Sequence, residues 1–266
     1  MNSTDWSAPI LQDKYPAEPS AFTPDNLLRE ARRQKGLPTA NVPGVCVLDP
    51  DGDIVRELVA AGRAYRDPSW ACYHTDLYVI GVGESAYGLI GGVVGASFAV
   101  LVAEELFACG CQYLLSITSA GQIAPLQAPP YFILIDRALR DEGTSYHYLP
   151  PARYSLADPI LLDRAQGAFA NAGFTVVRGA TWTTDAPFRE TTTTITARRD
   201  EGILAVEMEA AALYAFATAR SKPVLCLAHV TNQMGRTDGD FEKGEANGAR
   251  DALQLIEAIV TGVTPG

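Results

Sequence analysis

The sequence contains little histidine and no excess of positive charge, and each shortage excludes a class of function. Three of the 266 residues are His, and among the five cysteines only Cys109 and Cys111 lie close together. These numbers do not supply the ligand set of a zinc site, so we expect no metal. Lys and Arg number 21 against 31 Asp and Glu, a formal net charge of −10 at pH 7. We therefore predict no nucleic-acid partner, because no broad cationic surface is available to hold a phosphate backbone.

Long hydrophobic runs are also missing. The most apolar stretch, 89–103, is interrupted by three glycines and closed by Glu104 and Glu105, and it is shorter than the roughly 20 residues that cross a bilayer. The N-terminus lacks the basic segment and apolar segment of a secretory signal. The cysteines are odd in number and lie mostly in apolar runs, which suits reduced thiols. The sequence predicts a cytoplasmic protein without a membrane anchor.

The remaining composition is that of a globular protein, with 47% hydrophobic and 20% charged residues. Residues 1–23 are rich in proline and polar side chains, so we predict an extended N-terminal arm there. Thr23-Pro24-Asp25 is a typical helix start and Gly36 a typical helix end. Residues 24–266 show no internal repeat and no linker, and we interpret them as one α/β domain.

Hydrophobic spacing predicts an alternation of strands and helices along that domain. Because several strands are continuous apolar runs, they favour a mixed, largely parallel central sheet with helices on both faces. We leave 191–200 as a polar segment. The predicted strands are 44–49, 77–80, 88–91, 113–117, 131–135, 175–182, 203–206 and 224–230, and the predicted helices are 24–35, 52–64, 96–108, 159–172, 208–220 and 238–260.

Two carboxylates stand at the junction of an apolar strand and an alanine-rich helix, in Glu207-Met208-Glu209. Acids at a helix N-terminus are stabilised by the helix dipole, so both could be structural. Alternatively, one carboxylate at the carboxyl end of a strand accepts hydrogen bonds from a sugar, since open α/β sheets bind ligands there. The motif alone leaves both interpretations open.

This segment resembles the ribose-binding signature of the nucleoside phosphorylase family, which includes uridine phosphorylase, hexameric purine nucleoside phosphorylase and methylthioadenosine nucleosidase. The resemblance implies that Met208 packs on the ribose, that Glu209 holds its 2′ and 3′ hydroxyls, and that Glu207 lies beside the sugar. Further segments resemble the family pattern in the same order: 95–121, with its glycine turn, Glu-Glu-Leu helix and Ser116-Ile117-Thr118-Ser119-Ala120-Gly121 strand, then 141–148 and 183–188.

The same resemblance assigns residues to the base. Phe188 matches the aromatic that stacks on the base, with Trp182 as a second candidate. Arg189 lies where pyrimidine-specific members bind the base edge. Purine-specific members use an Asp as general acid after the last strand, whereas this chain has Asn232, which is similar to the pyrimidine-specific pattern and implies an amide that stabilises the departing base.

The phosphate-binding pattern of the family is incomplete here. Leu48, Gly52 and Ser116 stand where the family has Gly, Arg and Arg, and the place of an inter-subunit Arg falls near His74. Ser119, with Thr118, remains to face the nucleophile. Either another cation holds phosphate, with Arg56, Arg140 and the arm as candidates, or water is the nucleophile. Water needs a base, and the candidates are Glu209, Glu142, Asp51 and Asp53.

The sequence therefore predicts cleavage of the N-glycosidic bond of a ribonucleoside, with phosphorolysis to base and ribose 1-phosphate as the first hypothesis. Hydrolysis is the first alternative, and a nucleoside-binding protein without catalysis is the second alternative. Glu209 and Asn232 are the predicted catalytic residues. The resemblance implies no cofactor other than phosphate as co-substrate, and a homo-oligomer, either a dimer or a trimer of dimers.

Overall fold

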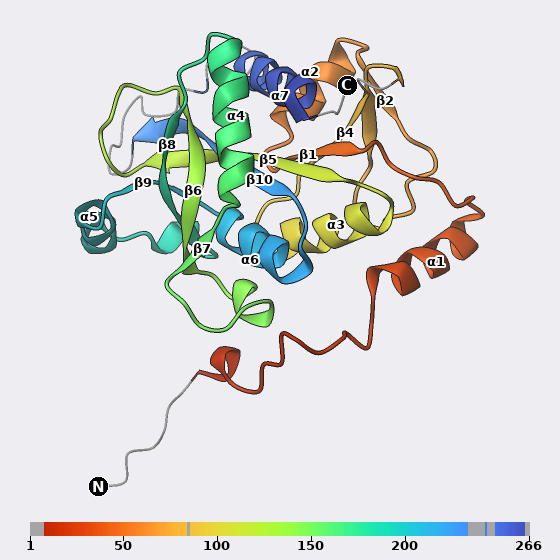
Figure 1. Cartoon of the computed structure of the whole chain (residues 1–266), viewed down its shortest axis with the longest axis horizontal. Coiled ribbons are helices and arrows are strands. Elements are labelled where there is room, and N and C mark those ends of the chain that lie inside the picture. The colour runs from red at the N-terminus through yellow and green to blue at the C-terminus, as the bar shows by residue number, and fades with distance from the viewer. Residues whose placement is uncertain (1–7, 84–85, 234–242, 244–247, 264–266) are drawn as a thin grey trace, which may run out of the picture.

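A mixed β-sheet forms the centre of the protein (Figure 1). The structure is a computed structural model that describes residues 8–83, 86–233, 243 and 248–263. Within these residues the sheet has ten strands in the order β10-β6-β8-β9-β5-β1-β4-β3-β2, with β7 paired to β6. The strands are β1 (Val45–Asp49), β2 (Ala64–Arg66), β3 (Tyr78–Ile80), β4 (Tyr87–Gly91), β5 (Tyr113–Gln122), β6 (Tyr131–Asp141), β7 (Tyr154–Leu156), β8 (Val177–Thr184), β9 (Ile203–Glu207) and β10 (Val224–Gln233).

One end of the sheet closes on itself, because β5 pairs with both β9 and β10. Parallel pairing joins β4, β1, β5 and β10, and also joins β6, β8 and β9. The two sets meet in antiparallel contacts between β10 and β6 and between β5 and β9. In the second contact Gly121 pairs with Val206, so the end of β5 lies beside the end of β9. The predicted mixed α/β architecture is confirmed.

The helices pack in two groups (Figure 1). In that view α2, α4 and α7 lie together at the top, while α3 and α6 pack against each other below. None of the described helices is long and apolar enough to cross a membrane. The helices are α1 (Pro24–Lys35), α2 (Asp53–Ala60), α3 (Ala96–Ala108), α4 (Pro159–Asn171), α5 (Thr192–Asp200), α6 (Ala210–Arg220) and α7 (Ala249–Val263).

Local capping explains where several helices begin and end. The hydroxyl of Thr23 accepts a hydrogen bond from the amide of Asn26 at 3.3 Å, and Gly36 ends α1 with φ at +66°, a conformation that glycine adopts without strain. These are the predicted limits of α1. α3 also has the predicted limits and begins after Gly95, whose φ is +95°.

Some elements differ from the prediction. The polar segment 191–200 contains helix α5, in which Thr191 caps the first turn and Ile195 is the one buried side chain, so the apolar spacing that marks a helix is absent. Segment 52–64 contains α2 and the first residue of β2, and α6 begins at Ala210 rather than at Met208. The last helix begins at Ala249, and of the predicted 238–248, residues 238–242 and 244–247 lie outside the described residues.

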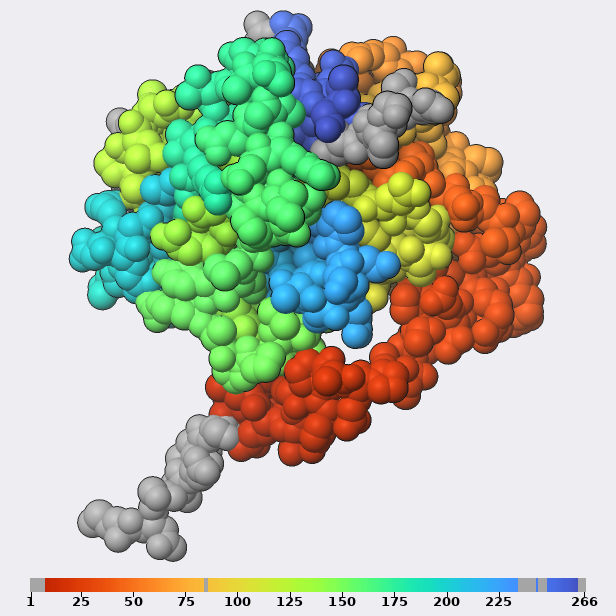
Figure 2. All heavy atoms as spheres, viewed as in Figure 1, coloured from red at the N-terminus to blue at the C-terminus, as the bar shows by residue number. Residues whose placement is uncertain are grey.

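The N-terminal segment crosses the surface of its own chain. Residues 8–23, with a short 3-10 helix η1 (Pro9–Leu11), run along the lower edge of the molecule to α1 (Figures 1 and 2). If Gly143 carried a Cβ atom, that atom would lie 3.7 Å from Cδ1 of Ile10. This part of the arm therefore packs beside the loop after β6. The division of the chain at residue 24 stays a prediction.

The main core surrounds α6, where Tyr214 is fully buried. Its hydroxyl donates to the carbonyl of Ile135 on β6 at 2.7 Å and accepts from the amide of Cys226 on β10 at 3.0 Å. The five cysteines are buried and form no disulfide. Tyr214 therefore ties the middle of α6 to two strands.

We expect Tyr214→Phe to lower the free energy of unfolding by about 1–3 kcal/mol, because it leaves a buried amide and a buried carbonyl without their partner. Urea denaturation measures this loss. Tyr65→Phe is the matched control, since the Tyr65 side chain is exposed, and it should leave stability unchanged. Equal stability of the Tyr214 variant and the wild type would contradict the role given to the hydroxyl.

Candidate active site

The Glu-Met-Glu motif lies where β9 turns into α6, next to the end of β5. The antiparallel contact of β5 with β9 brings Thr118 to the carboxylate of Glu209, although 91 residues separate them in the chain. Met208 is half-buried between two buried acids. The closed end of the sheet therefore assembles this site.

Glu207 has a structural role. One of its carboxylate oxygens accepts hydrogen bonds from the hydroxyls of Thr181 and Thr183, and the other accepts from the amides of Glu209 and Ala210, each at 2.7 Å. The side chain is buried, and burial raises its pKa. Glu207 thus caps the start of α6, and its predicted place beside the sugar stays a prediction.

Glu209 is buried as well, but it joins three different elements. Its Oε1 accepts from the amide of Gly95 before α3 at 2.7 Å, and its Oε2 accepts from the hydroxyl of Thr118 on β5 at 2.7 Å. Burial raises its pKa to about 7, and the neighbouring charge of Glu207 adds to the shift. Oε2 also accepts from the amide of Met208 at 3.3 Å. An ionised carboxylate has about four acceptor positions, so these three hydrogen bonds leave Glu209 one position for a ligand hydroxyl.

The residues predicted to face the nucleophile lie at a small cavity. Ser119 and Thr118 line a cavity of about 20 Å³ whose other walls come from the β1–α2 turn, His229 on β10 and the start of α7. Asp49 in that turn is buried and accepts from the amides of Gly52 and Val55 at 3.1 and 3.0 Å. Burial raises the pKa of Asp49 to about 6. Asp49 therefore caps α2.

Lys243 meets this turn from a distant part of the chain. Its ammonium lies 2.6 Å from Asp53 and 3.2 Å from Asp51. Arg56 pairs with Asp53 on the outer side. Lys243 could not be predicted as part of this site from the sequence, because 190 residues separate it from Asp53 and nothing in its local pattern indicates the contact.

His229 lines the same cavity from β10. Its ring stacks on Phe132 with centroids 4.5 Å apart, and its Cε1 lies against the backbone of Gly248, where a Cβ atom would clash with it. The ring is therefore held between an aromatic face and the backbone. Burial lowers its pKa to about 4, and its Nε2 is buried with no hydrogen-bond partner in the described part of the chain.

The residues predicted to hold the base lie in different environments. Trp182 is 2% exposed in a second, smaller core, with its indole donating to Asp141, so it fills the interior and presents no face to a base. Phe188 is 98% exposed and Arg189 is exposed beside it. Asn232 is half-buried on β10, opposite Gly121 of β5, and thus lies near the motif.

Other candidates from the sequence have partners elsewhere. Arg140 is buried and donates to Ser145, to the carbonyl of Leu149 and to that of Pro150, so three of its five donors are used within the loop after β6. Glu142 accepts from the amides of Thr144 and Ser145 and shapes its own loop. His74 is exposed between the rings of Tyr73 and Phe98, and its service to a neighbouring subunit stays a prediction.

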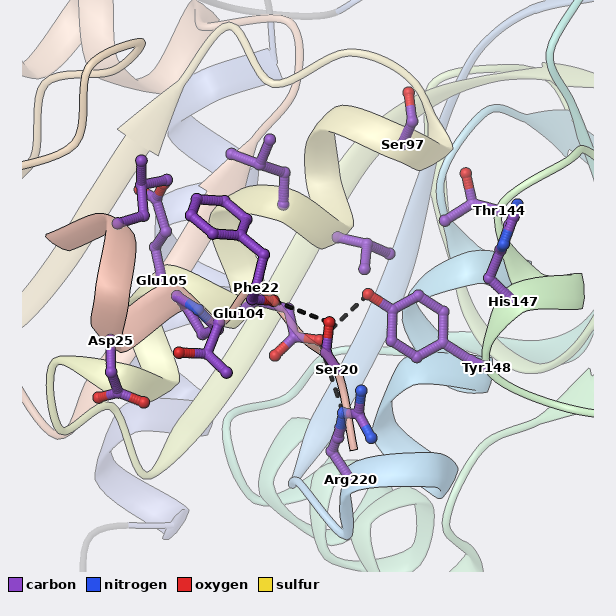
Figure 3. Close-up of a pocket in the computed structure, with 15 residues that line it drawn as sticks. Ser20, Phe22, Asp25, Ser97, Glu104, Glu105, Thr144, His147, Tyr148 and Arg220 are labelled. Carbon is purple, nitrogen blue, oxygen red and sulfur yellow. Dashed lines mark hydrogen bonds and ion pairs between the residues drawn. The ribbon is translucent and has the colours of Figure 1, made fainter. Parts of the chain in front are cut away.

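A larger cavity of about 680 Å³ lies between the arm and the body (Figure 3). Phe22 comes from the arm, Glu104 from α3 and Arg220 from α6, with Arg220 3.6 Å from Glu104. Tyr148 also donates to Glu104, at 3.1 Å. None of the motif residues lines this cavity. It is therefore separate from the site at the end of β5.

A family model described as the phosphorylase superfamily matches residues 45–261. The chain belongs to this superfamily. A guanosine phosphorylase from Halorubrum lacusprofundi is 27% identical over 201 residues, which cover 76% of each chain. The match to the family model, over residues 45–261, includes the strands and helices that assemble the site described above.

Solved structures show the same fold as this superfamily member. A uridine phosphorylase from Vibrio fischeri has a TM-score of 0.68 at 20% identity, with 85% of this chain and 93% of that chain covered. A purine nucleoside phosphorylase from Toxoplasma gondii, in complex with immucillin-H, has a TM-score of 0.70 at 14% identity, with 84% and 91% covered. The predicted family and fold are confirmed.

The raised pKa of Glu209 gives a prediction about stability. Because the folded pKa of about 7 exceeds the ordinary 4.5, the contribution of this carboxyl to stability is complete below about pH 4.5 and is lost as the pH rises through about 7. Glu209→Gln keeps a neutral group at every pH. We expect this variant to be more stable than the wild type at pH 8, by about 3 kcal/mol, and equal to it below about pH 4.

Denaturation across pH 4–8 measures the difference between the two proteins. Glu57→Gln, which changes an exposed acid on α2, is the control and should show no such trend. A Glu209 variant that is less stable than the wild type at pH 8 would show that the ionised carboxylate stabilises the fold.

Proposed function

We propose that this protein cleaves the N-glycosidic bond of a nucleoside. The observation that carries the proposal is the buried carboxylate of Glu209, held by Gly95 and Thr118 at the end of β5. A fixed, desolvated carboxylate is suited to accept hydrogen bonds from a vicinal diol such as the 2′ and 3′ hydroxyls of ribose. The names of the relatives, guanosine, uridine and purine nucleoside phosphorylases, support the same substrate class.

In this proposal the carboxylate of Glu209 accepts hydrogen bonds from the sugar while the sugar ring becomes cationic. Hydrogen bonds from the hydroxyls to the carboxylate strengthen as positive charge develops at C1′, so they stabilise the transition state more than the bound substrate. Met208 packs on the sugar. Asn232 on β10 donates its amide to the departing base, and Phe188 and Arg189, both exposed in the single chain, contact the base. A neighbouring subunit in a homo-oligomer covers them.

The first acceptor to test is inorganic phosphate, as in the names of the relatives, with Ser119 and Thr118 facing it. Hydrolysis is the second candidate, and a specific observation favours it. Asp49, Asp51 and Asp53 line the cavity beside Ser119, and carboxylates repel a phosphate dianion. The proposal includes no metal, and a cytoplasmic location stays a prediction.

Release of free base decides the function. The purified protein is incubated with purine and pyrimidine ribonucleosides, with and without millimolar phosphate, and the products are separated by chromatography. Base release that requires phosphate, with ribose 1-phosphate as the second product, would identify a phosphorylase. Release independent of phosphate, with free ribose, would identify a nucleosidase. Saturable nucleoside binding without base release would contradict catalysis and indicate a binding protein.

Glu209→Gln should reduce kcat/KM by about 100- to 1000-fold, the size expected when a charged transition-state contact becomes neutral. The wild-type kcat/KM should rise with pH through about 7, because the ionised carboxylate is the acceptor and burial raises its pKa to about 7. Glu57→Gln is the control and should retain both rate and profile. Full activity of the Glu209 variant would remove this residue from the sugar site.

A further inference from the structure

In the β1–α2 turn, amide and guanidinium groups that could bind an anion already have partners within the protein. The amides of Gly52 and Val55 donate to the carboxylate of Asp49, and the guanidinium of Arg56 binds Asp53 and the carbonyl of Asp51. A helix N-terminus usually offers its amides to an anionic ligand. Here the protein's own carboxylate takes that place.

The one lysine at this turn is also engaged. Lys243 binds Asp53 at 2.6 Å and Asp51 at 3.2 Å, and its side chain is only 22% exposed. Asp49, Asp51 and Asp53 therefore face two cations, Lys243 and Arg56. Among the described residues, the cluster has no surplus positive charge with which to attract a dianion.

The space that remains beside Ser119 is about 20 Å³. One water molecule needs at least about 10–15 Å³ of such space, whereas phosphate has five non-hydrogen atoms. His229 lines this cavity, and its Nε2 is buried without a partner in the described chain. The charged groups that act on His229 are Asp51, Asp53, Asp251 and Lys243, and with burial they leave its pKa at about 4. The imidazole is therefore neutral at neutral pH and can accept a hydrogen bond.

We propose that Lys243, held between Asp51 and Asp53, fills the phosphate subsite and restricts the nucleophile to one water molecule bound by Ser119 and His229. This inference rests on the proposed cleavage of a nucleoside. It chooses water over phosphate and names the residues that make the choice. Lys243 sets the specificity, and His229 touches the reacting water.

The proposed hydrolysis needs no reactant other than water and the nucleoside. The water oxygen forms a bond to C1′ while the bond from C1′ to the base nitrogen breaks, and the electron pair of that bond leaves with the base. One water proton passes to Nε2 of His229, and it then reaches the departing base through solvent. The products are ribose and free base.

Phosphate binding and product identity test the proposal together. We titrate inorganic phosphate into the full-length protein and follow the ³¹P line width, and we measure base release from 0 to 50 mM phosphate. The wild type should show no phosphate binding, a rate independent of phosphate and ribose as the sugar product. Phosphate binding by the wild type at millimolar concentration, or ribose 1-phosphate as its product, would overturn the proposal.

Variants then test the role of Lys243. The double variant Asp51→Asn/Asp53→Asn releases the ammonium, so phosphate should bind at millimolar concentration and ribose 1-phosphate should increase at least 10-fold over the wild type. A triple variant that also carries Lys243→Met should lose both the phosphate binding and the increase in ribose 1-phosphate. A matched double variant, Glu30→Gln/Asp163→Asn, removes two exposed acids that pair with arginines elsewhere and should behave as the wild type.

A folded Asp51/Asp53 variant that gains no phosphate binding would contradict the specificity role of Lys243. If that variant does not fold by circular dichroism, the wild-type titration still decides whether the subsite is filled. His229→Ala should lower kcat at least 10-fold with KM unchanged, and an unchanged kcat would remove His229 from the water site. Absence of base release from every nucleoside would contradict the proposed function. The phosphate titration would still test whether Lys243, Asp51 and Asp53 prevent phosphate from binding.

Discussion

The site depends on one buried interaction, the hydrogen bonding of the Glu209 carboxylate to the amide of Gly95 and the hydroxyl of Thr118. These bonds join the start of α6, the start of α3 and the end of β5. Burial of a carboxylate is costly, and the raised pKa of about 7 records that cost. Glu207 and Tyr214 supply compensating hydrogen bonds, because they fix the first turn and the middle of α6. A group that destabilises the fold is therefore held in a rigid frame, as is common at functional sites.

A second constraint is the balance of charge at the β1–α2 turn. Three aspartates face one cavity, and Lys243 and Arg56 offset them. Asp49 is buried and Asp51 and Asp53 are partly buried. Carboxylates grouped in this way repel one another, so the cations stabilise the turn whether or not a ligand binds. In the proposal that Lys243 fills the phosphate subsite, the same ion pairs that stabilise this turn also select the nucleophile.

Local patterns predicted much of the fold. The limits of α1 and α3 followed from Thr23, Gly36 and Gly95, since caps depend on neighbouring residues. Helix α5 was missed because Ile195 is its one buried side chain. The closure of the sheet through β5, β9 and β10 was also beyond the sequence, because pairing between distant strands leaves no local periodicity.

The sequence by itself determined the superfamily, the alternation of strands and helices, and the motif that contains Glu209. The tertiary structure decided which acid does what: Glu207 caps a helix, Glu209 bridges three elements, and Asp49 caps α2. It also placed Trp182 in the core and Lys243 beside Asp53. The reason is physical, since the role of a charged or aromatic side chain depends on its burial and its partners. Those partners come from segments up to 190 residues away.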